Sequence, residues 1–130
     1  MTKEKLEIYK CTVCGNIVQV LLVGGGELIC CNQPMTMQTV QHDKSELGEK
    51  HAPVIETRDN TKIVQVKTHP MLKEHYIQFI EVFDNEKKEM HLKYFEPENI
   101  PEFDISYLKD DVKAVEFCNL HGLWGENKND

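Results

Sequence analysis

Short runs of alternating or β-branched apolar residues recur along the chain, and each run stops at a cluster of polar residues, glycine or proline. Such runs predict β-strands, because successive side chains of a strand point to opposite faces. No segment has the apolar spacing of a helix longer than a turn or two. We therefore expect strands, in chain order, at residues 17–23, 54–55, 62–66, 75–83, 90–95 and 112–117.

The segments between these strands contain the turn signals. Gly24-Gly25-Gly26 predicts a turn back towards residue 30, and residues 84–88 predict a hairpin turn. Residues 96–104 contain two prolines and predict a crossing loop, and residues 33–48 predict a connector with at most one short strand. The pattern predicts an all-β protein, with a small hairpin domain at residues 1–37 and an antiparallel β-sandwich at residues 38–130.

Length and charge limit the classes of function. A chain of 130 residues can form one substantial core with a small appendage. No apolar run has the length of a membrane span, and the first residues lack the apolar core of an export signal, so we expect no membrane association and a cytoplasmic location. The formal net charge of −7 argues against a nucleic-acid partner.

Four of the five cysteines form one group near the N-terminus. Cys11 and Cys14 have the CxxC spacing of a metal knuckle, and the predicted hairpin returns the chain to Cys30 and Cys31. The hairpin has too little apolar material to fold alone, so a metal is expected to serve as its core. Because neighbouring residues point in opposite directions, the pair Cys30-Cys31 needs a distorted turn. Zinc and an electron-carrying iron both remain open at this site.

The fifth cysteine belongs to a second group. Cys118 and His121 have CxxH spacing at the end of the last predicted strand. Three further histidines stand at strand ends or proline-restrained turns, whereas His42 and His91 are interpreted as ordinary surface or core residues. Five protein ligands exceed the number that structural zinc takes and favour iron with one position left open. The predicted ligands of this second metal are Cys118, His51, His69, His75 and His121.

The motifs together resemble the desulfoferrodoxin family, the two-iron superoxide reductases, over nearly the whole chain. The N-terminal part of the resemblance rests on Cys11-Thr12-Val13-Cys14-Gly15 and on Cys30-Cys31-Asn32-Gln33-Pro34. Its C-terminal part rests on four motifs: Glu49-Lys50-His51-Ala52-Pro53, His69-Pro70-Met71, His75-Tyr76-Ile77 and Cys118-Asn119-Leu120-His121-Gly122-Leu123-Trp124. The chain departs from the family at Asn32, where glycine is usual, and at Phe79, where tryptophan is common.

The resemblance implies a desulforedoxin-like Fe(Cys)₄ domain and an immunoglobulin-like sandwich with an Fe(His)₄(Cys) centre. It implies one-electron reduction of superoxide to hydrogen peroxide, a rubredoxin-like electron donor and a homodimer. Lys50 is expected to attract superoxide, and Glu49 is expected to occupy the open position of the oxidised iron. Taken alone, such an acidic-basic pair is usually a solvated surface feature. Two other functions stay open: a zinc-ribbon module that binds another protein, and an electron carrier whose second iron is fully ligated.

Overall fold

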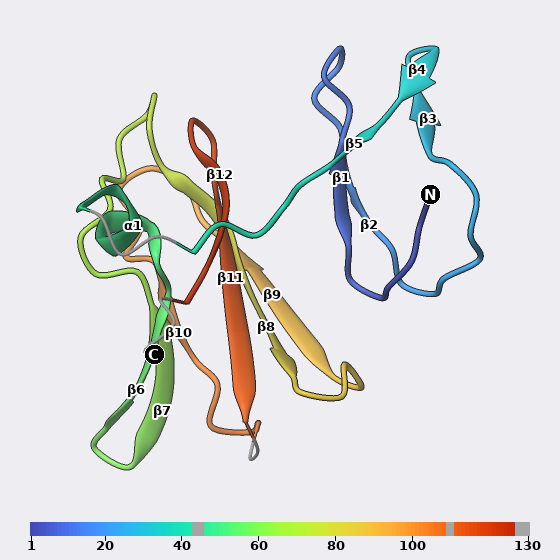
Figure 1. The fold of residues 1–130 in the computed structure, drawn as a ribbon. Helices are drawn as coiled ribbons and strands as arrows, with labels where there is room; N and C mark the ends of the chain where they lie inside the picture. The colour runs from blue at the N-terminus through green and yellow to red at the C-terminus, as the bar shows by residue number, and fades with distance from the viewer. Residues whose placement is uncertain (43–45, 109–110, 127–130) are drawn as a thin grey trace. The chain divides into compact units, whose positions relative to one another are not determined.

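A computed structural model of the chain describes residues 1–42, 46–108 and 111–126, without the side chains of Glu46, Leu47 and Glu49. The chain divides into two compact units, Met1–Thr39 and Val40–Asp130 (Figure 1). Apart from one six-residue helix, all the regular structure of the described residues is β-structure, and this confirms the all-β prediction. No helix in these described ranges is long and apolar enough to cross a membrane.

The first unit is a small sheet with a hairpin. β1 (Ile8–Lys10) pairs antiparallel with β2 (Ile17–Gln19) on one side and with β5 (Thr36–Met37) on the other. β3 (Ile29–Cys30) and β4 (Gln33–Pro34) form a separate antiparallel pair. The predicted strand 17–23 is therefore too long, because β2 ends at Gln19. The connector predicted at 33–48 contains two short strands where at most one was expected.

The second unit consists of two antiparallel sheets. The three-stranded sheet has the order β10-β7-β6, from Glu102–Asp104, Thr61–Gln65 and Val54–Arg58. The four-stranded sheet has the order β12-β11-β8-β9, from Gly122–Gly125, Val112–Cys118, Ile77–Asp84 and Met90–Tyr94. One buried apolar cluster includes Val64 and Phe103 of the first sheet and Ile80, Val82 and Ala114 of the second, so the unit is a β-sandwich.

Three elements of the second unit escaped prediction. Helix α1 (Glu46–His51) begins inside the predicted connector, and β12 is a four-residue strand with glycine at both ends. β10 lies inside the predicted crossing loop, where Pro101 comes directly before it and masks the strand signal. The sheet nevertheless accepts β10, because the strand pairs with β7 and buries Phe103 in the core.

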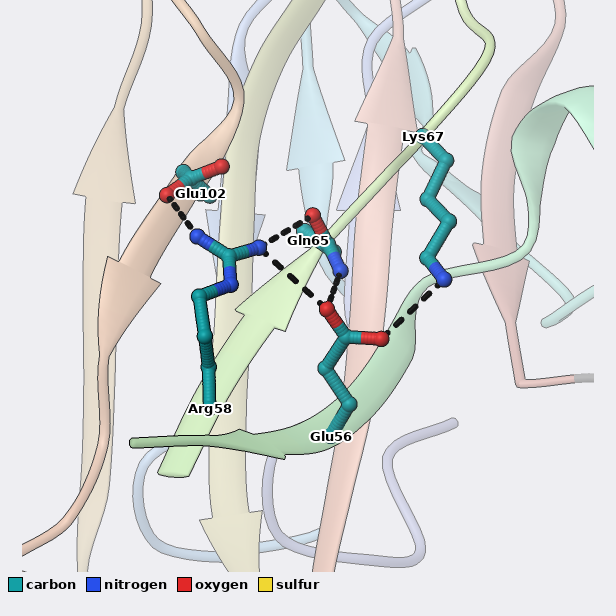
Figure 2. A network of polar contacts seen from close by, with 5 residues as sticks. All are labelled: Glu56, Arg58, Gln65, Lys67 and Glu102. Carbon is teal, nitrogen blue, oxygen red and sulfur yellow. Dashed lines mark hydrogen bonds and ion pairs between the residues drawn. The ribbon is translucent and has the colours of Figure 1, made fainter. Parts of the chain in front are cut away.

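A polar network ties the three-stranded sheet together on its outer surface (Figure 2). Arg58 of β6 contacts Glu56 at 3.2 Å and Glu102 of β10 at 3.3 Å, and Lys67 contacts the other oxygen of Glu56 at 3.0 Å. Gln65 of β7 completes the network through bonds to Arg58 and Glu56. The Lys67 and Arg58 cations hold the pKa of the Glu56 carboxyl below its usual range. This exposed network aligns three strands more than it adds stability.

Candidate metal centres

In the first unit, two tight turns bring four cysteines together. The amide of Gly15 donates to the carbonyl of Cys11 at 2.9 Å, and Gly15 has a φ of +85° that other residues rarely adopt. Between β3 and β4, Cys31 and Asn32 both have positive φ values, +52° and +64°. This is the distorted turn that the adjacent cysteines require, and asparagine tolerates its left-handed conformation in place of the usual glycine.

The four sulfur atoms of this cluster lie within 4.8 Å of one another, and none forms a disulfide. Cys14 Sγ is 3.6 Å from Cys30 Sγ, and the Cys14 amide donates to Cys11 Sγ at 3.5 Å. That amide lowers the pKa of Cys11 to about 6, whereas contact with the neighbouring thiols raises the pKa of Cys31 to about 12. Four crowded thiols cannot all ionise without a cation between them, so this donor set fits a metal ion such as iron or zinc.

The second cluster is assembled from five residues that lie at or near the ends of elements in the sandwich. His51 is the last residue of α1, His69 follows β7, and His75 lies two residues before the start of β8. Cys118 ends β11, and His121 lies in the turn that leads into β12. The ligand atoms of His51, His69, His75 and Cys118 lie within 4.8 Å of one another. His121 joins them through its Nδ1, which is 3.1 Å from His51 Nε2 and 3.8 Å from Cys118 Sγ.

The four imidazole rings form a closed square. Neighbouring ring centroids are 4.6, 4.7, 5.0 and 4.9 Å apart in the order His51, His69, His75, His121 and back to His51. The diagonal from His51 to His75 is longer, at 6.4 Å. Neighbouring planes are steeply inclined, by 72° to 87°, which is the arrangement of four rings around a common centre rather than of a stack.

The protonation of the rings also suits a metal. His69 Nδ1 lies 2.6 Å from the carbonyl oxygen of Pro70, so that nitrogen carries the proton and Nε2 keeps a lone pair for the centre. Burial lowers the pKa of His69 to about 4 and lowers the pKa of His75 as well, so both rings are neutral near pH 7. His75 Nε2 is buried without a hydrogen-bond partner among the described residues. A cation would satisfy this orphaned atom.

Cys118 supplies the sulfur of the cluster from a fully buried position. Burial raises the pKa of its thiol, and the backbone amides of Leu120 and His121 act in the opposite direction by donating towards the sulfur. A cation beside the sulfur would stabilise the thiolate further. Four imidazoles and one thiolate are a donor set that fits iron, whereas structural zinc normally takes four ligands.

Other side chains fix the ligand segments, and sequence reasoning missed their role. Asn119 Oδ1 accepts the amide of Tyr76 at 2.9 Å, and its Nδ2 donates to the carbonyl of Glu74 at 3.1 Å, so Asn119 brackets His75. The Trp124 indole stacks on the His51 ring at 4.7 Å and donates to the His121 carbonyl at 3.1 Å. The only signal for these roles was the position of both residues inside the Cys118 to Trp124 motif.

The other residues singled out in the sequence are Lys50, Glu49, His42 and His91. Lys50 is exposed at the end of α1, one residue before His51. The side chain of Glu49 lies outside the described part of the structure. His42 and His91 belong to neither cluster: His42 Nδ1 lies 2.8 Å from the Glu126 carbonyl, and the His91 ring stacks on Phe103 at 4.9 Å.

The fold and the two clusters define a protein with two metal centres of different character, one closed by four thiolates and one built from imidazoles and a thiolate. Comparison with known proteins then supplies the family. The model of the desulfoferrodoxin N-terminal domain matches residues 3–37, and the desulfoferrodoxin model matches residues 43–127. The chain belongs to the desulfoferrodoxin family. The cofactor is iron: the four-cysteine cluster matches an Fe(Cys)₄ centre, and the histidine cluster with Cys118 matches an Fe(His)₄(Cys) centre.

Individual relatives cover almost the whole chain. The desulfoferrodoxin homolog of Archaeoglobus fulgidus is 44% identical over 123 residues, which are 93% of this chain and 96% of that protein. The desulfoferrodoxin of Syntrophotalea carbinolica is also 44% identical, over 93% of this chain and 95% of its own. Among solved structures, the superoxide reductase from Treponema pallidum has a TM-score of 0.68 at 26% identity and covers 95% of this chain and 98% of its own.

Proposed function

We propose that this chain is a superoxide reductase, which converts superoxide to hydrogen peroxide at the four-histidine, one-cysteine centre. Each superoxide consumes one electron and two protons, and no oxygen is released. The observation that carries the proposal is the square of imidazoles with a buried thiol beside it. Family membership and the fold shared with the Treponema pallidum superoxide reductase support it.

Iron bound by five ligands would supply the electron and leave one coordination position for an external molecule. The chain's own residues prepare this site. The Pro70 carbonyl fixes the protonated nitrogen of His69, and burial keeps His69 and His75 neutral, so their lone pairs face the centre. The amides of Leu120 and His121 favour the anionic form of Cys118. An anionic sulfur donor favours electron transfer to the bound substrate.

Lys50 and Glu49 are proposed to act around the open position. The chain carries a net charge of −7, which repels an anionic substrate, and Lys50 next to His51 supplies a local positive charge. At a separation of about 4 Å a unit charge contributes roughly 1 kcal/mol in water and about 4 kcal/mol near a protein surface. Glu49 is proposed to occupy the open position of the oxidised iron, so Glu49→Ala changes the spectrum of that state and leaves turnover largely intact.

The charge of Lys50 can be tested against a matched lysine. Lys50→Ile should slow superoxide capture by about fivefold or more, and the loss should shrink at high salt. Lys88→Ile removes the same charge in the turn after β8, at the opposite end of that strand from His75, about 25 Å away at the rise of a strand. Stopped-flow or pulse-radiolysis rates should fall only in Lys50→Ile. Equal rates in the two variants would refute this role.

The thiolate centre is proposed to pass or store electrons, with a rubredoxin-like protein as donor. A cytoplasmic location is proposed with it, because reducing conditions there would keep these thiols free of disulfides. Removal of this centre by Cys14→Ser should abolish its absorption and leave direct superoxide reduction in place, because the second centre lies entirely in the other unit.

The chain is also proposed to form a homodimer through its first unit. Leu21, Leu22 and Ile29 are 65%, 79% and 63% exposed, and together with Val18 and Met35 they border a hollow of 510 Å³. The first unit exposes more large apolar side chains than it buries. This favours an apolar partner surface, such as the same unit of a second copy. Sedimentation should give the mass of two chains, and Leu22→Lys should weaken the dimer more than Leu72→Lys in the second unit.

One combined experiment distinguishes the proposed function from its rivals. The iron content per chain is measured, and the protein is then mixed with superoxide in the stopped flow while hydrogen peroxide and oxygen are quantified. A superoxide reductase contains two irons and yields one peroxide per superoxide without oxygen. Zinc in place of iron at both centres would indicate a binding module. Two irons that do not respond to superoxide would indicate an electron carrier.

A further inference from the structure

His121 differs from the other ligands of the second centre in its surroundings. His51, His69 and Cys118 are buried and His75 is half-buried, whereas His121 is exposed. A buried ring is held by the side chains packed around it, but an exposed ring depends on its backbone for its position. The position of His121 therefore depends on what holds the turn between β11 and β12.

Two donors hold the backbone carbonyl of His121. One is the indole of Trp124 at 3.1 Å, and the other is the side-chain amide of Gln41 at 2.8 Å. The Gln41 amide also reaches the carbonyl of Leu123 at 3.2 Å. It lies against Gly122, which has a φ of +83° and where an added Cβ would come within 3.4 Å of Gln41 Nε2. Gln41 thus spans both sides of the glycine at which the ligand turn enters β12.

Gln41 itself is anchored by its own backbone. Its backbone amide donates to the carbonyl of Leu123 at 3.1 Å, and its backbone carbonyl accepts the amide of Gly125 at 2.9 Å. Gln41 therefore forms a parallel bridge with Trp124 at the open edge of β12. A Cβ at Gly125 would lie 2.5 Å from His42 and 2.7 Å from Val40. The segment 40–42 therefore lies closely along β12, at a place that only glycine leaves free.

We propose that Gln41 is a positioning residue for His121, and that the first residues of the second unit, 40–42, act as a strap on the exposed ligand of the metal centre. The inference rests on the metal site of the proposed function but not on its superoxide chemistry. Removal of the Gln41 amide leaves the His121 carbonyl with the indole of Trp124 as its donor. The ligand turn then moves more freely, and the metal leaves the second centre faster.

The test compares Gln41→Met with Gln38→Met in the full-length iron protein. Methionine keeps the length of the side chain and removes the amide donor. Gln38 is a matched control, because its amide also donates to a backbone carbonyl, that of Thr36 at 3.1 Å, in a segment without metal ligands. Iron transfer to a chelator is followed in time, with each centre identified by its absorption spectrum, and thermal unfolding by circular dichroism checks the fold.

In Gln41→Met we expect the second centre to release iron about two- to fivefold faster, the change that loss of an exposed hydrogen bond of roughly 0.5–1 kcal/mol produces. Its absorption bands should shift, and release from the four-thiolate centre should not change. Release as slow as in Gln38→Met, or equal acceleration at both centres, overturns the proposal. If Gln41→Met does not fold, Gln41→Glu carries the same test, because its carboxylate keeps the shape and cannot donate to either carbonyl; unchanged release there also overturns it.

Discussion

Asn119 offers a sharp test of how the sandwich holds its second metal centre. Asn119 lies between Cys118 and His121 in the sequence. Its side chain forms hydrogen bonds with the backbone of Glu74 and Tyr76, the residues on either side of His75. Its own amide also donates to the Tyr76 carbonyl at 3.2 Å. The substitution Asn119→Ala keeps that backbone bond and removes both side-chain bonds. Asn119→Ala therefore weakens the link between the His75 segment and the Cys118–His121 segment without changing a ligand.

The expected loss follows from the environment of each bond. The Glu74 carbonyl is exposed and can bond to water, so loss of this partner costs about 0.5 kcal/mol. The Tyr76 amide is half-buried, and an unpaired donor in such a place costs roughly 1–2 kcal/mol. We expect Asn119→Ala to lower the unfolding free energy of the metal-free second unit by about 2 kcal/mol. The loss should be larger in the iron-bound protein, because loosened ligand segments also bind the metal more weakly.

The assay is urea unfolding of both forms, followed by circular dichroism. Asn99→Ala is the control: Asn99 Oδ1 accepts the amide of Glu96 at 2.8 Å, and Asn99 donates its own amide to the Glu96 carbonyl, in a turn without ligands. The control should lose similar stability with and without iron. If Asn119→Ala also loses the same amount in both forms, Asn119 stabilises the sandwich only, and its assignment to the metal centre is wrong.

Two further predictions concern acid and the small centre. Burial lowers the pKa of His69 in the folded chain from 6.5 to about 4, so the unfolded chain binds a proton more readily. The contribution of His69 to the free energy of unfolding is therefore complete above pH 6.5, and about 3 kcal/mol is lost as the pH falls from 6.5 through 4. Acid titration of the metal-free protein, followed by circular dichroism, should show this loss, and His69→Gln should not. Cys14→Ser should unfold the first unit and leave the melting of the second unchanged, since the apolar cluster described in the second unit contains only residues between Ile55 and Ala114. A shared transition in calorimetry would contradict this.

The closely spaced pairs of candidate ligands could be recognised in the sequence because their pattern is local. Cys11 and Cys14, or Cys118 and His121, stand three residues apart, and that spacing by itself indicates a shared ion. The strands with long apolar alternation, such as β8 and β11, were predicted for the same reason. A pattern that repeats within a few residues can be recognised without knowledge of the fold.

The arrangement of the ligands could not be predicted in this way. His51 and His121 are in contact at 3.1 Å across 70 residues of sequence, and Gln41 reaches His121 across 80. Such contacts depend on strand pairing and on short elements such as β12 and α1, whose local sequences carry almost no signal. The support of the site by Asn119, Gln41 and Trp124 is therefore visible only in the folded chain.

The two centres also differ in what organises them. The first unit buries few large apolar side chains, chiefly Ile8, Tyr9 and Val20, so its four thiolates need a cation to hold the turns together. The second unit has a continuous apolar core, and its donor atoms converge on that scaffold. The first centre should therefore accept any ion that binds four thiolates well, including zinc. The second should select its ion through the geometry that the sandwich imposes, because a square of four imidazoles with a sulfur donor suits a metal that accepts five or six ligands and disfavours one that prefers a tetrahedron.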